Sequence, residues 1–484
     1  MDFGAITLFL MFYYVRPQEW IPMVSSLRLV AFSMVFALVA TLMRERGFTP
    51  RDLLRTPHDW LMLLYFLWIV GSSGSARETL GKVYAFALYY VVTVQALSPN
   101  IERIQKFLNW WTVMILMVAA LAVGSEYGFD LMGSYDITHG SMKDRLVLNT
   151  SIFNNPNALG HSVVAVVVML YFILWWKRPV FLKIASIPLL ALPLYCIYLT
   201  QSKGSYLSAF AAIVTALAFN RPKVVQILIL IGAMTVGWAG LHLLPRMNEL
   251  DKSTRNDQAI QGRVAAFRFG LDVMRRETTG LGYGAFEPQF FKVHKYTKAP
   301  HSSYVQVGAE LGKTGFTLFL GIMYCCLRTL ITCKTSNTAQ ERVRRILFVL
   351  LTCYIVSSWM VGFAFRATFF LMAAAVGAFH RQLAGIVSEQ RPVRELEPDT
   401  ELVPALRFGP LQPAFATPAA APIAASLISV GTPTEIKITT TAGDPPETPQ
   451  IGIRWMRIGW VDIVLILIMS SVAERFWAYI NHTM

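Results

Sequence analysis

The sequence predicts an all-α membrane protein that crosses the bilayer about 12–13 times. Hydrophobic residues make up 55% of the 484 residues and charged residues only 15%, which is too apolar for a soluble domain of this length. Apolar runs close to the roughly 20 residues needed to span a bilayer recur along the chain. One long polar segment, residues 245–302, interrupts them, and it is the natural place for chemistry because ionisable groups at a membrane boundary are usually functional.

The apolar runs define the expected transmembrane helices. We expect spans near 1–15, 22–43, 58–72, 78–97, 108–124, 158–176, 180–199, 204–219, 223–244, 303–327, 346–363, 366–380 and 458–474. Several runs are shorter than about 20 residues, so the count is expected to be accurate only to within one or two.

Lysine and arginine in the short loops predict the orientation, because these residues concentrate on the cytoplasmic side. One set of alternating loops holds sixteen of them and the other set holds six. The N-terminus is therefore expected in the cytoplasm, and segment 245–302, Asn154 and Lys203 on the outer side. The net charge of +14 then mainly reflects the lysine and arginine residues of the cytoplasmic loops. Because no soluble basic domain carries that charge, we expect no nucleic-acid partner. The sixteen are Arg44, Arg46, Arg51, Arg55, Arg103, Lys106, Lys177, Arg178, Lys183, Arg221, Lys223, Arg328, Lys334, Arg342, Arg344 and Arg345; the six are Arg16, Arg77, Lys143, Arg145, Lys203 and Arg366.

Composition divides the chain into four parts. Residues 1–150 hold the N-terminal spans, and residues 151–382 hold a second group of spans with the polar loop 245–302. Residues 383–455 form a linker that we expect to be disordered and cytoplasmic, because 11 of the 24 prolines lie between 386 and 452 and few aromatic residues do. Residues 456–484 hold a final span, with a re-entrant or surface helix as the alternative.

The polar loop contains an amphipathic stretch. Ile260, Val264, Phe267, Leu271 and Met274 recur at helical spacing and form one apolar stripe, while charged residues occupy another face. This pattern predicts a helix lying on the membrane surface with its apolar side down.

Arg263 borders the apolar stripe of this helix. Its guanidinium can point along the membrane plane and bind the phosphate of a lipid through two parallel hydrogen bonds. Alternatively, it only extends from the helix to the lipid headgroups, as basic residues on such helices commonly do.

His301 and Glu310 are the other ionisable candidates at this boundary. Gly280, Gly282 and Gly284 predict a tight turn that returns the chain to the membrane, where His301 precedes a span. A neutral imidazole there can accept a proton from a hydroxyl, or it can simply cap the helix. Glu310 is an intramembrane acid, which either serves the site or pairs with a cation such as Lys313.

Two further patches are expected on the same side. Asn154 and Asn157 open a span with amide groups suited to sugar hydroxyls. Lys203 lies in a very short turn, and together with Arg263 it would form a cationic pair able to hold a diphosphate and stabilise it as a leaving group.

These motifs together resemble the O-antigen ligase and polymerase superfamily, multi-span bacterial inner-membrane glycosyltransferases of the GT-C type. The resemblance covers about 150–380, and the order and spacing of the motifs carry it. They are Phe153-Asn154-Asn155-Pro156-Asn157, Gln201-Ser202-Lys203-Gly204, Gly262-Arg263 with Phe267, Gly280-Leu281-Gly282-Tyr283-Gly284, His301-Ser302-Ser303-Tyr304 and Glu310-Leu311-Gly312.

The resemblance implies a reaction and its partners. The family transfers a glycan from an undecaprenyl-diphosphate carrier to an acceptor hydroxyl on the periplasmic face, with inversion and without a metal or nucleotide cofactor. Acceptors are lipid A-core in ligases, a growing chain in polymerases, or a protein. Arg263 would bind the diphosphate and His301 would be the base or position the acceptor, with Lys203, Asn154, Asn157, Tyr304 and Glu310 lining the substrate site.

The sequence also departs from the family. Lys203 stands where a second arginine is expected, Ser302 replaces an asparagine, Phe267 replaces a tryptophan, and the linker and last span are additions. Two other hypotheses stay open: an exporter of lipid-linked sugars, which would need internal symmetry and buried charges, and a non-enzymatic scaffold of an envelope polysaccharide complex.

Overall fold

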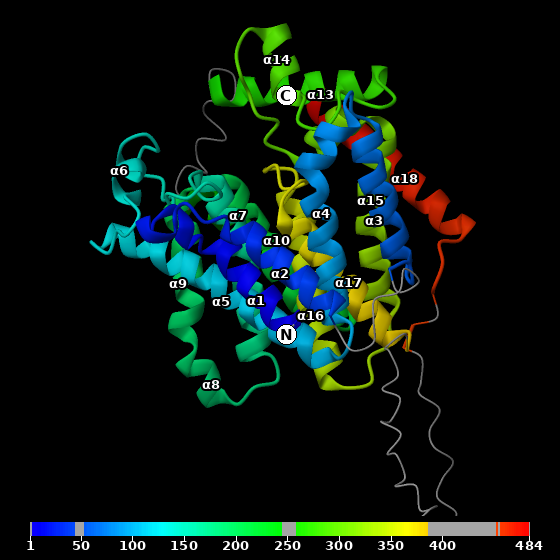
Figure 1. Cartoon of the computed structure of the whole chain (residues 1–484). Helices are drawn as coiled ribbons and strands as arrows, with labels where there is room; N and C mark the ends of the chain where they lie inside the picture. Colours follow the sequence, from blue (N-terminus) through cyan, green and yellow to red (C-terminus); the bar gives the residue numbers. More distant parts are fainter. Residues whose placement is uncertain (1, 44–52, 244–257, 386–451, 454, 484) are drawn as a thin grey trace, which may run out of the picture. The chain divides into compact units, whose positions relative to one another are not determined.

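Every apolar run predicted to span the membrane contains a helix in the computed structural model. The structure describes residues 2–43, 53–243, 258–385, 452–453 and 455–483, which belong to one packed unit (Figure 1). The first half contains α1 (Asp2–Tyr14), α2 (Leu29–Leu42), α3 (Pro57–Gly71), α4 (Ala76–Leu97), α5 (Ile101–Glu126), α6 (Ser134–His139), α7 (Pro156–Leu170), which continues into the π-helical turn η4 (Tyr171–Trp175), α8 (Val180–Ala185) and α9 (Ile187–Thr200). The second half contains α10 (Lys203–Ala218), α11 (Lys223–Leu243), α13 (Gln258–Arg276), α14 (Phe286–His294), α15 (Ser303–Thr332), α16 (Thr338–Ser357), α17 (Ala367–Leu383) and α18 (Trp460–Thr483).

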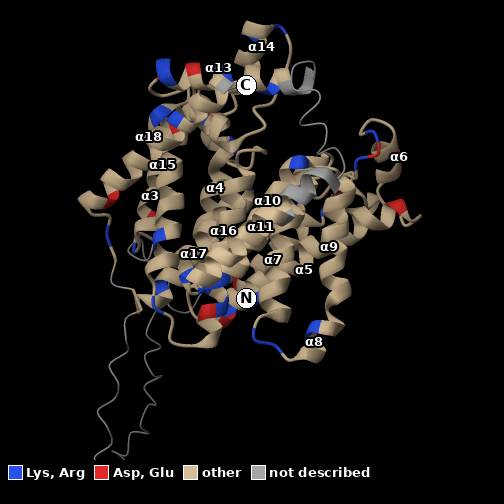
Figure 2. Cartoon of the chain, turned by 180° about the vertical axis from the view of Figure 1, so that it is seen from behind, with Lys and Arg blue, Asp and Glu red and all other residues tan. Residues whose placement is uncertain are grey.

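The chain is a polytopic helical membrane protein. Among the described residues, six helical stretches are long and apolar enough to cross a bilayer: 76–97, 101–126, 156–175, 180–200, 303–332 and 460–482. The shorter apolar helices are α2, α10 and the first part of α11, so a total of 12–13 crossings stays a prediction. Lysine, arginine and acidic residues lie mainly at the ends of the helices and on α13, and the middle of the bundle is largely free of them (Figure 2).

The helices pack around a centre formed by α5, α7, α16 and α17. In the described residues α17 packs along α4, α1 along α2, and α7 against α9 and α10, while α10 also contacts α16. α13 runs across the ends of α4 and α15, and the described residues that flank the linker, Leu383 and Gly452, lie together at the opposite end of the bundle (Figure 1). We call these the α13 end and the linker end.

Several helix boundaries differ from the predicted spans, those of α2 and α16 among them. α2 begins at Leu29 rather than near 22, because Pro22 opens a short 3-10 turn, η2 (Pro22–Val24), and the chain turns again before the helix. Arg28 therefore lies outside the helix as its N-cap. α16 begins at Thr338 and ends at Ser357, which leaves residues 358–366 as a connection to α17.

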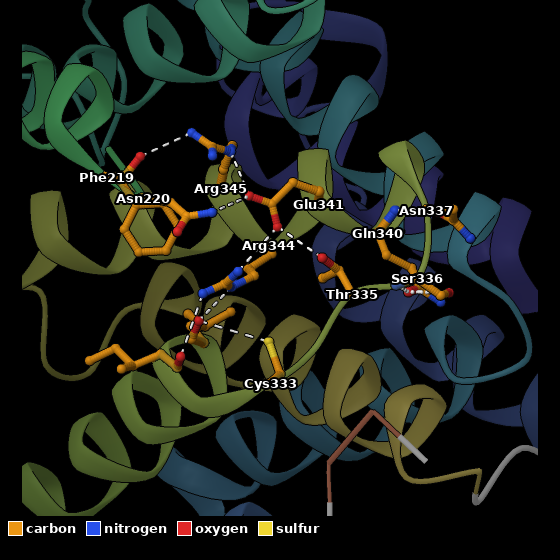
Figure 3. A network of polar contacts seen from close by, with 12 residues as sticks. Phe219, Asn220, Cys333, Thr335, Ser336, Asn337, Gln340, Glu341, Arg344 and Arg345 are labelled. Atoms are coloured by element: carbon orange, nitrogen blue, oxygen red, sulfur yellow. Dashed lines mark hydrogen bonds and ion pairs between the residues drawn. The ribbon is translucent and has the colours of Figure 1, made fainter. Parts of the chain in front are cut away.

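At the linker end, a polar network joins three helices (Figure 3). Glu341 accepts a hydrogen bond from Arg345 Nε (2.7 Å) and pairs with Arg344 (3.2 Å). Arg345 also donates to the Phe219 carbonyl after α10 (3.1 Å), and Arg344 donates to the Leu330 carbonyl in α15 (2.8 Å). Two arginines of the predicted cytoplasmic set thus satisfy helix-terminal carbonyls, which have no partner within their own helices.

The two ends of the linker meet at this same end. The Gly452 N–H donates to the Leu383 carbonyl (2.9 Å), and the Lys334 N–H donates to the Gly452 carbonyl (2.8 Å). Residues 386–451 lie outside the described residues, so the predicted disorder of the 383–455 linker stays a prediction.

The glycine segment 280–284 docks onto a break in α15. Gly312 leaves the helical conformation (φ 64°, ψ −167°), which exposes carbonyls of the preceding turn. The Ala309 carbonyl accepts from Leu281 N–H (3.0 Å) and the Glu310 carbonyl from Gly282 N–H (2.8 Å). Trp68 Nε1 donates to the next carbonyl, that of residue 311 (2.8 Å). The predicted turn is therefore present, and α15 itself holds it.

Gly280 is the residue that permits this contact, and it provides a test. Its φ is +75°, and an added Cβ would lie 2.4 Å from the Gly312 nitrogen. Gly284 shares the positive φ (+74°) but has nothing within 4 Å of such a Cβ. We expect Gly284→Ala to cost about 1–2 kcal/mol of stability, from backbone conformation alone. Gly280→Ala should cost several times more, because backbone atoms must also move apart. Thermal unfolding of the purified variants in detergent measures both; equal melting temperatures would contradict the docking.

Candidate functional site

The amphipathic helix of the polar loop is α13, and its polarity follows the predicted pattern. Leu271 and Met274 are buried, whereas Arg268 and Asp272 on the other face are exposed. Its apolar face packs against α15 and α18, so protein covers the face that was expected to meet lipid, and the position of this helix on the membrane surface stays a prediction. The sequence pattern reveals an apolar face but does not say whether lipid or protein covers it.

α18 fixes α13 through one buried tryptophan. The Trp477 ring lies against Gly270 of α13 and Gly308 of α15, where an added Cβ would come within 3.2 Å and 2.8 Å of it. Its indole Nε1 donates to the Phe267 carbonyl (3.2 Å). Glu474, one turn earlier, pairs with Arg275 of α13 (3.2 Å) and Lys313 of α15 (3.3 Å). The last helix therefore positions the helix that carries Arg263.

His301 has an uncommon backbone conformation. Its φ is 48°, in the left-handed region that non-glycine residues rarely occupy and that costs about 1–3 kcal/mol. The next two residues hold it: Ser302 Oγ donates to the Ser358 carbonyl (3.1 Å), and Ser303 Oγ donates to the Val361 carbonyl (2.9 Å). Strain of this kind persists only where the surroundings enforce it, and it clusters at functional sites.

The surroundings of His301 keep its imidazole neutral. Burial, followed by the positive charges of Arg263 and Lys298, lowers the pKa of His301 to about 4. The Lys298 side chain reaches α13, where it lies against Gly262, next to Arg263. The predicted arginine and histidine are thus close enough to interact electrostatically, and the histidine has an unprotonated nitrogen at neutral pH.

Lys203 and Asn157 are linked through the cap of α10. The Ser202 side chain caps α10, whose first residue is Lys203, and its hydroxyl donates to Asn157 Oδ1 (2.9 Å). Arg145 donates to the same oxygen (3.0 Å) and to the Thr200 carbonyl (3.2 Å). Asn157 therefore holds the lysine turn in place. Asn154, three residues earlier, is exposed.

His161 is a residue that the sequence reasoning missed. Its Nδ1 lies 2.9 Å from Ser357 Oγ and 3.2 Å from Ser208 Oγ. Its buried Nε2 has no hydrogen-bond partner among the described residues and would lie 2.8 Å from a Cβ on Gly204. It also interacts electrostatically with Arg263. An ionisable residue within a span was the available signal.

Tyr304 and Glu310 point into the protein. Tyr304 is buried and donates its hydroxyl to the Ile355 carbonyl of α16 (3.0 Å). Glu310 is 2% exposed, and its Oε1 accepts from the N–H of Phe286, the first residue of α14 (3.4 Å). The ion pair considered for Glu310 is made elsewhere, because Lys313 pairs with Glu474. Both side chains fix the helices around the site, and neither is exposed on its surface.

The structure thus links the predicted residues in two groups. Arg263 and His301 interact electrostatically, and Asn157 joins the lysine turn through Ser202. His161 lies between the groups, against Gly204 and within the field of Arg263. Within the residues that the structure describes, no group of three His, Cys, Asp or Glu is placed to hold a metal ion.

Fold and site define a multi-pass helical membrane protein with a neutral histidine and basic side chains gathered near one end of the bundle. Residues 188–320 match the family model of the O-antigen ligase, and this segment of the chain is therefore similar to that family. The matched segment contains Lys203, Arg263, His301, Tyr304 and Glu310. This family carries out glycan transfer or polymerisation in the synthesis of cell-surface polysaccharides. A search of curated proteins finds no match.

Two histidines with opposite pKa shifts test the electrostatics. Hydrogen bonding to Asp144 raises the pKa of the exposed His139, whereas the pKa of His301 is lowered. Diethyl pyrocarbonate modifies histidine in its neutral form and not in its protonated form. Between about pH 7.5 and 5.5, the modification rate of an ordinary histidine falls about ten-fold. We expect a larger fall for His139 and almost none for His301, measured by peptide mass spectrometry. Parallel pH profiles for the two residues would refute the assignment.

Proposed function

We propose that this protein transfers a glycan from an undecaprenyl-diphosphate carrier to an acceptor hydroxyl at the outer face of the bacterial inner membrane. The N-terminus is then cytoplasmic, and the α13 end of the bundle faces the periplasm. The observation that carries the proposal is the neutral His301 in a strained backbone conformation, within the field of Arg263, in a segment that matches the O-antigen ligase family.

The proposed reaction is a single inverting displacement. The acceptor hydroxyl attacks the anomeric carbon of the donor sugar, and the bond between that carbon and the diphosphate oxygen breaks. The diphosphate leaves with the bonding electron pair, and the acceptor proton passes to the imidazole of His301. A histidine with a pKa near 4 holds that proton weakly, so it acts chiefly by orienting the hydroxyl and accepting the proton as the new bond forms.

The charge of the leaving diphosphate is met by Arg263 and Lys203 in this proposal, rather than by a metal ion. Diphosphate is a good leaving group, so the protein mainly has to position the reactants and neutralise charge. Asn157 contributes indirectly, because it fixes Ser202 and with it the turn that carries Lys203. Asn154 is exposed and remains a candidate for sugar hydroxyls.

The first prediction for this function concerns Arg263 and His301. Alanine at either position should reduce glycan transfer at least about 100-fold in a reconstituted assay with a lipid-diphosphate donor. Arg268→Ala is the matched control, because Arg268 lies on the same helix with its side chain exposed. It should retain activity within a few-fold. Full activity of the His301 and Arg263 variants, at normal protein level and membrane insertion, would favour a scaffold instead.

The second prediction concerns the lysine that stands where an arginine is expected. Lys203→Gln removes the charge and should lower transfer about 10-fold or more. Lys203→Arg keeps the charge and adds the bidentate fork, so it should retain most of the activity. The ratio of the two rates in the same assay is the measurement. Equal loss in both variants would mean that the shape of the turn matters and the charge does not.

Ligase and polymerase share this chemistry and differ in acceptor. Profiling the lipid-linked and attached glycans of a deletion strain separates them. Loss of all attached glycan, with lipid-linked polymer accumulating, identifies a ligase for lipid A-core or another acceptor. Loss of long chains with single units retained identifies a polymerase.

A further inference from the structure

A groove of about 410 Å³ opens between α2 and α4, and the site described above does not use it. Val30, Met34 and Val35 line it from α2, and Tyr84 and Leu88 line it from α4. Val35 and Tyr84 are about half exposed, so the groove is open along the side of the bundle. Because the side of a transmembrane bundle faces the bilayer, we expect lipid to reach this groove.

Charge is confined to one end of the groove, where Arg16, Glu19 and Arg28 line it. Arg16 forms an ion pair with Glu19 and a hydrogen bond with Ser151 Oγ. Arg28 is exposed and forms no ion pair or side-chain hydrogen bond with any described residue. One positive charge therefore stays uncompensated at this end.

The groove changes from charged to apolar along α2. No side chain caps the first turn of this helix, so its backbone N–H groups add partial positive charge beside Arg28. Val35 lies seven residues further on, which at 1.5 Å per residue is about 10 Å along the axis. All groove residues of α2 after Arg28 are apolar. The groove therefore matches a molecule with one anionic head and a long apolar chain.

We propose that this groove binds one membrane phospholipid, with its phosphodiester at Arg28 and an acyl chain between α2 and α4. Arginine suits a phosphate because its guanidinium donates two parallel hydrogen bonds. The single uncompensated charge complements a phosphodiester, which carries one negative charge. A polyprenyl diphosphate carries more charge, and Lys203 and Arg263 are its proposed partners. The phospholipid site is thus separate from the transferase site, and neither proposal depends on the other.

The charged end of the groove also contacts the loop that precedes α7. Glu19, at the charged end of the groove, accepts hydrogen bonds from the backbone and hydroxyl of Ser151 (2.7 Å and 2.8 Å). That loop leads through Asn154 to Asn157, which holds the lysine turn. The proposed lipid therefore occupies the far end of a chain of contacts that reaches Lys203.

Native mass spectrometry of the delipidated full-length protein tests the proposal. The protein is titrated with phosphatidylglycerol, with uncharged diacylglycerol of the same chains, and with undecaprenyl phosphate. We expect phosphatidylglycerol to bind at one tight site and diacylglycerol to bind at least about ten-fold more weakly. Arg28→Gln should weaken phosphatidylglycerol binding about ten-fold. Arg77→Gln is the control, because Arg77 is an exposed arginine of α4 that does not line the groove.

A groove-filling variant locates the binding. Ala31 is exposed and lines the groove, so Ala31→Trp should abolish the tight site while the protein keeps its melting temperature. Equal loss in Arg28→Gln and Arg77→Gln, or unchanged binding in Ala31→Trp, overturns the proposal. Tighter binding of undecaprenyl phosphate, with displacement of phosphatidylglycerol, also overturns it and assigns the groove to the sugar carrier.

Discussion

The break in α15 at Gly312 is the constraint on which the site depends. Within a bilayer, an interrupted helix leaves carbonyls that only the protein can satisfy, because the hydrocarbon offers no donors. Here Leu281, Gly282 and Trp68 supply them. The segment between α13 and α14 is therefore bonded to α15, and α13 cannot move away from that helix without leaving buried polar groups unpaired. These hydrogen bonds therefore fix the position of Arg263, which α13 carries.

Hydrogen bonds to backbone carbonyls also determine where His301 lies. The residue is strained, and Ser302 and Ser303 tie it to the connection between α16 and α17 rather than to its own neighbours. Two separate sets of contacts thus place the histidine and the arginine, one through residues 358–361 and the other through the glycine segment. Arg263 and His301 belong to one loop, but contacts with other helices bring them close enough to interact electrostatically.

Periodicity and composition predicted the helices, the polar loop and the amphipathic character of α13, because these follow from local patterns. They did not predict the start of α2, where Pro22 and the following turn moved the boundary to Leu29 and left Arg28 outside the helix. Nor did they predict that protein covers the apolar face of α13, since a stripe of apolar residues looks the same against lipid or another helix. The contacts of His161 and Asn157 join distant segments, and a single sequence contains no signal for such pairs.

The last helix explains why that face of α13 is covered by protein. One side of α18 is exposed along Ile463, Leu467 and Ile468, as expected for a helix that faces lipid. The other side places Trp477 between α13 and α15, and Asp462 pairs with Arg328 of α15 near the linker end. Asp462 and Glu474 therefore attach α18 to α15 by ion pairs twelve residues apart. The sequence offered no reason for adding a span after a long linker. The packing supplies one: without α18, the apolar face of the helix that carries Arg263 would be only partly covered by α15.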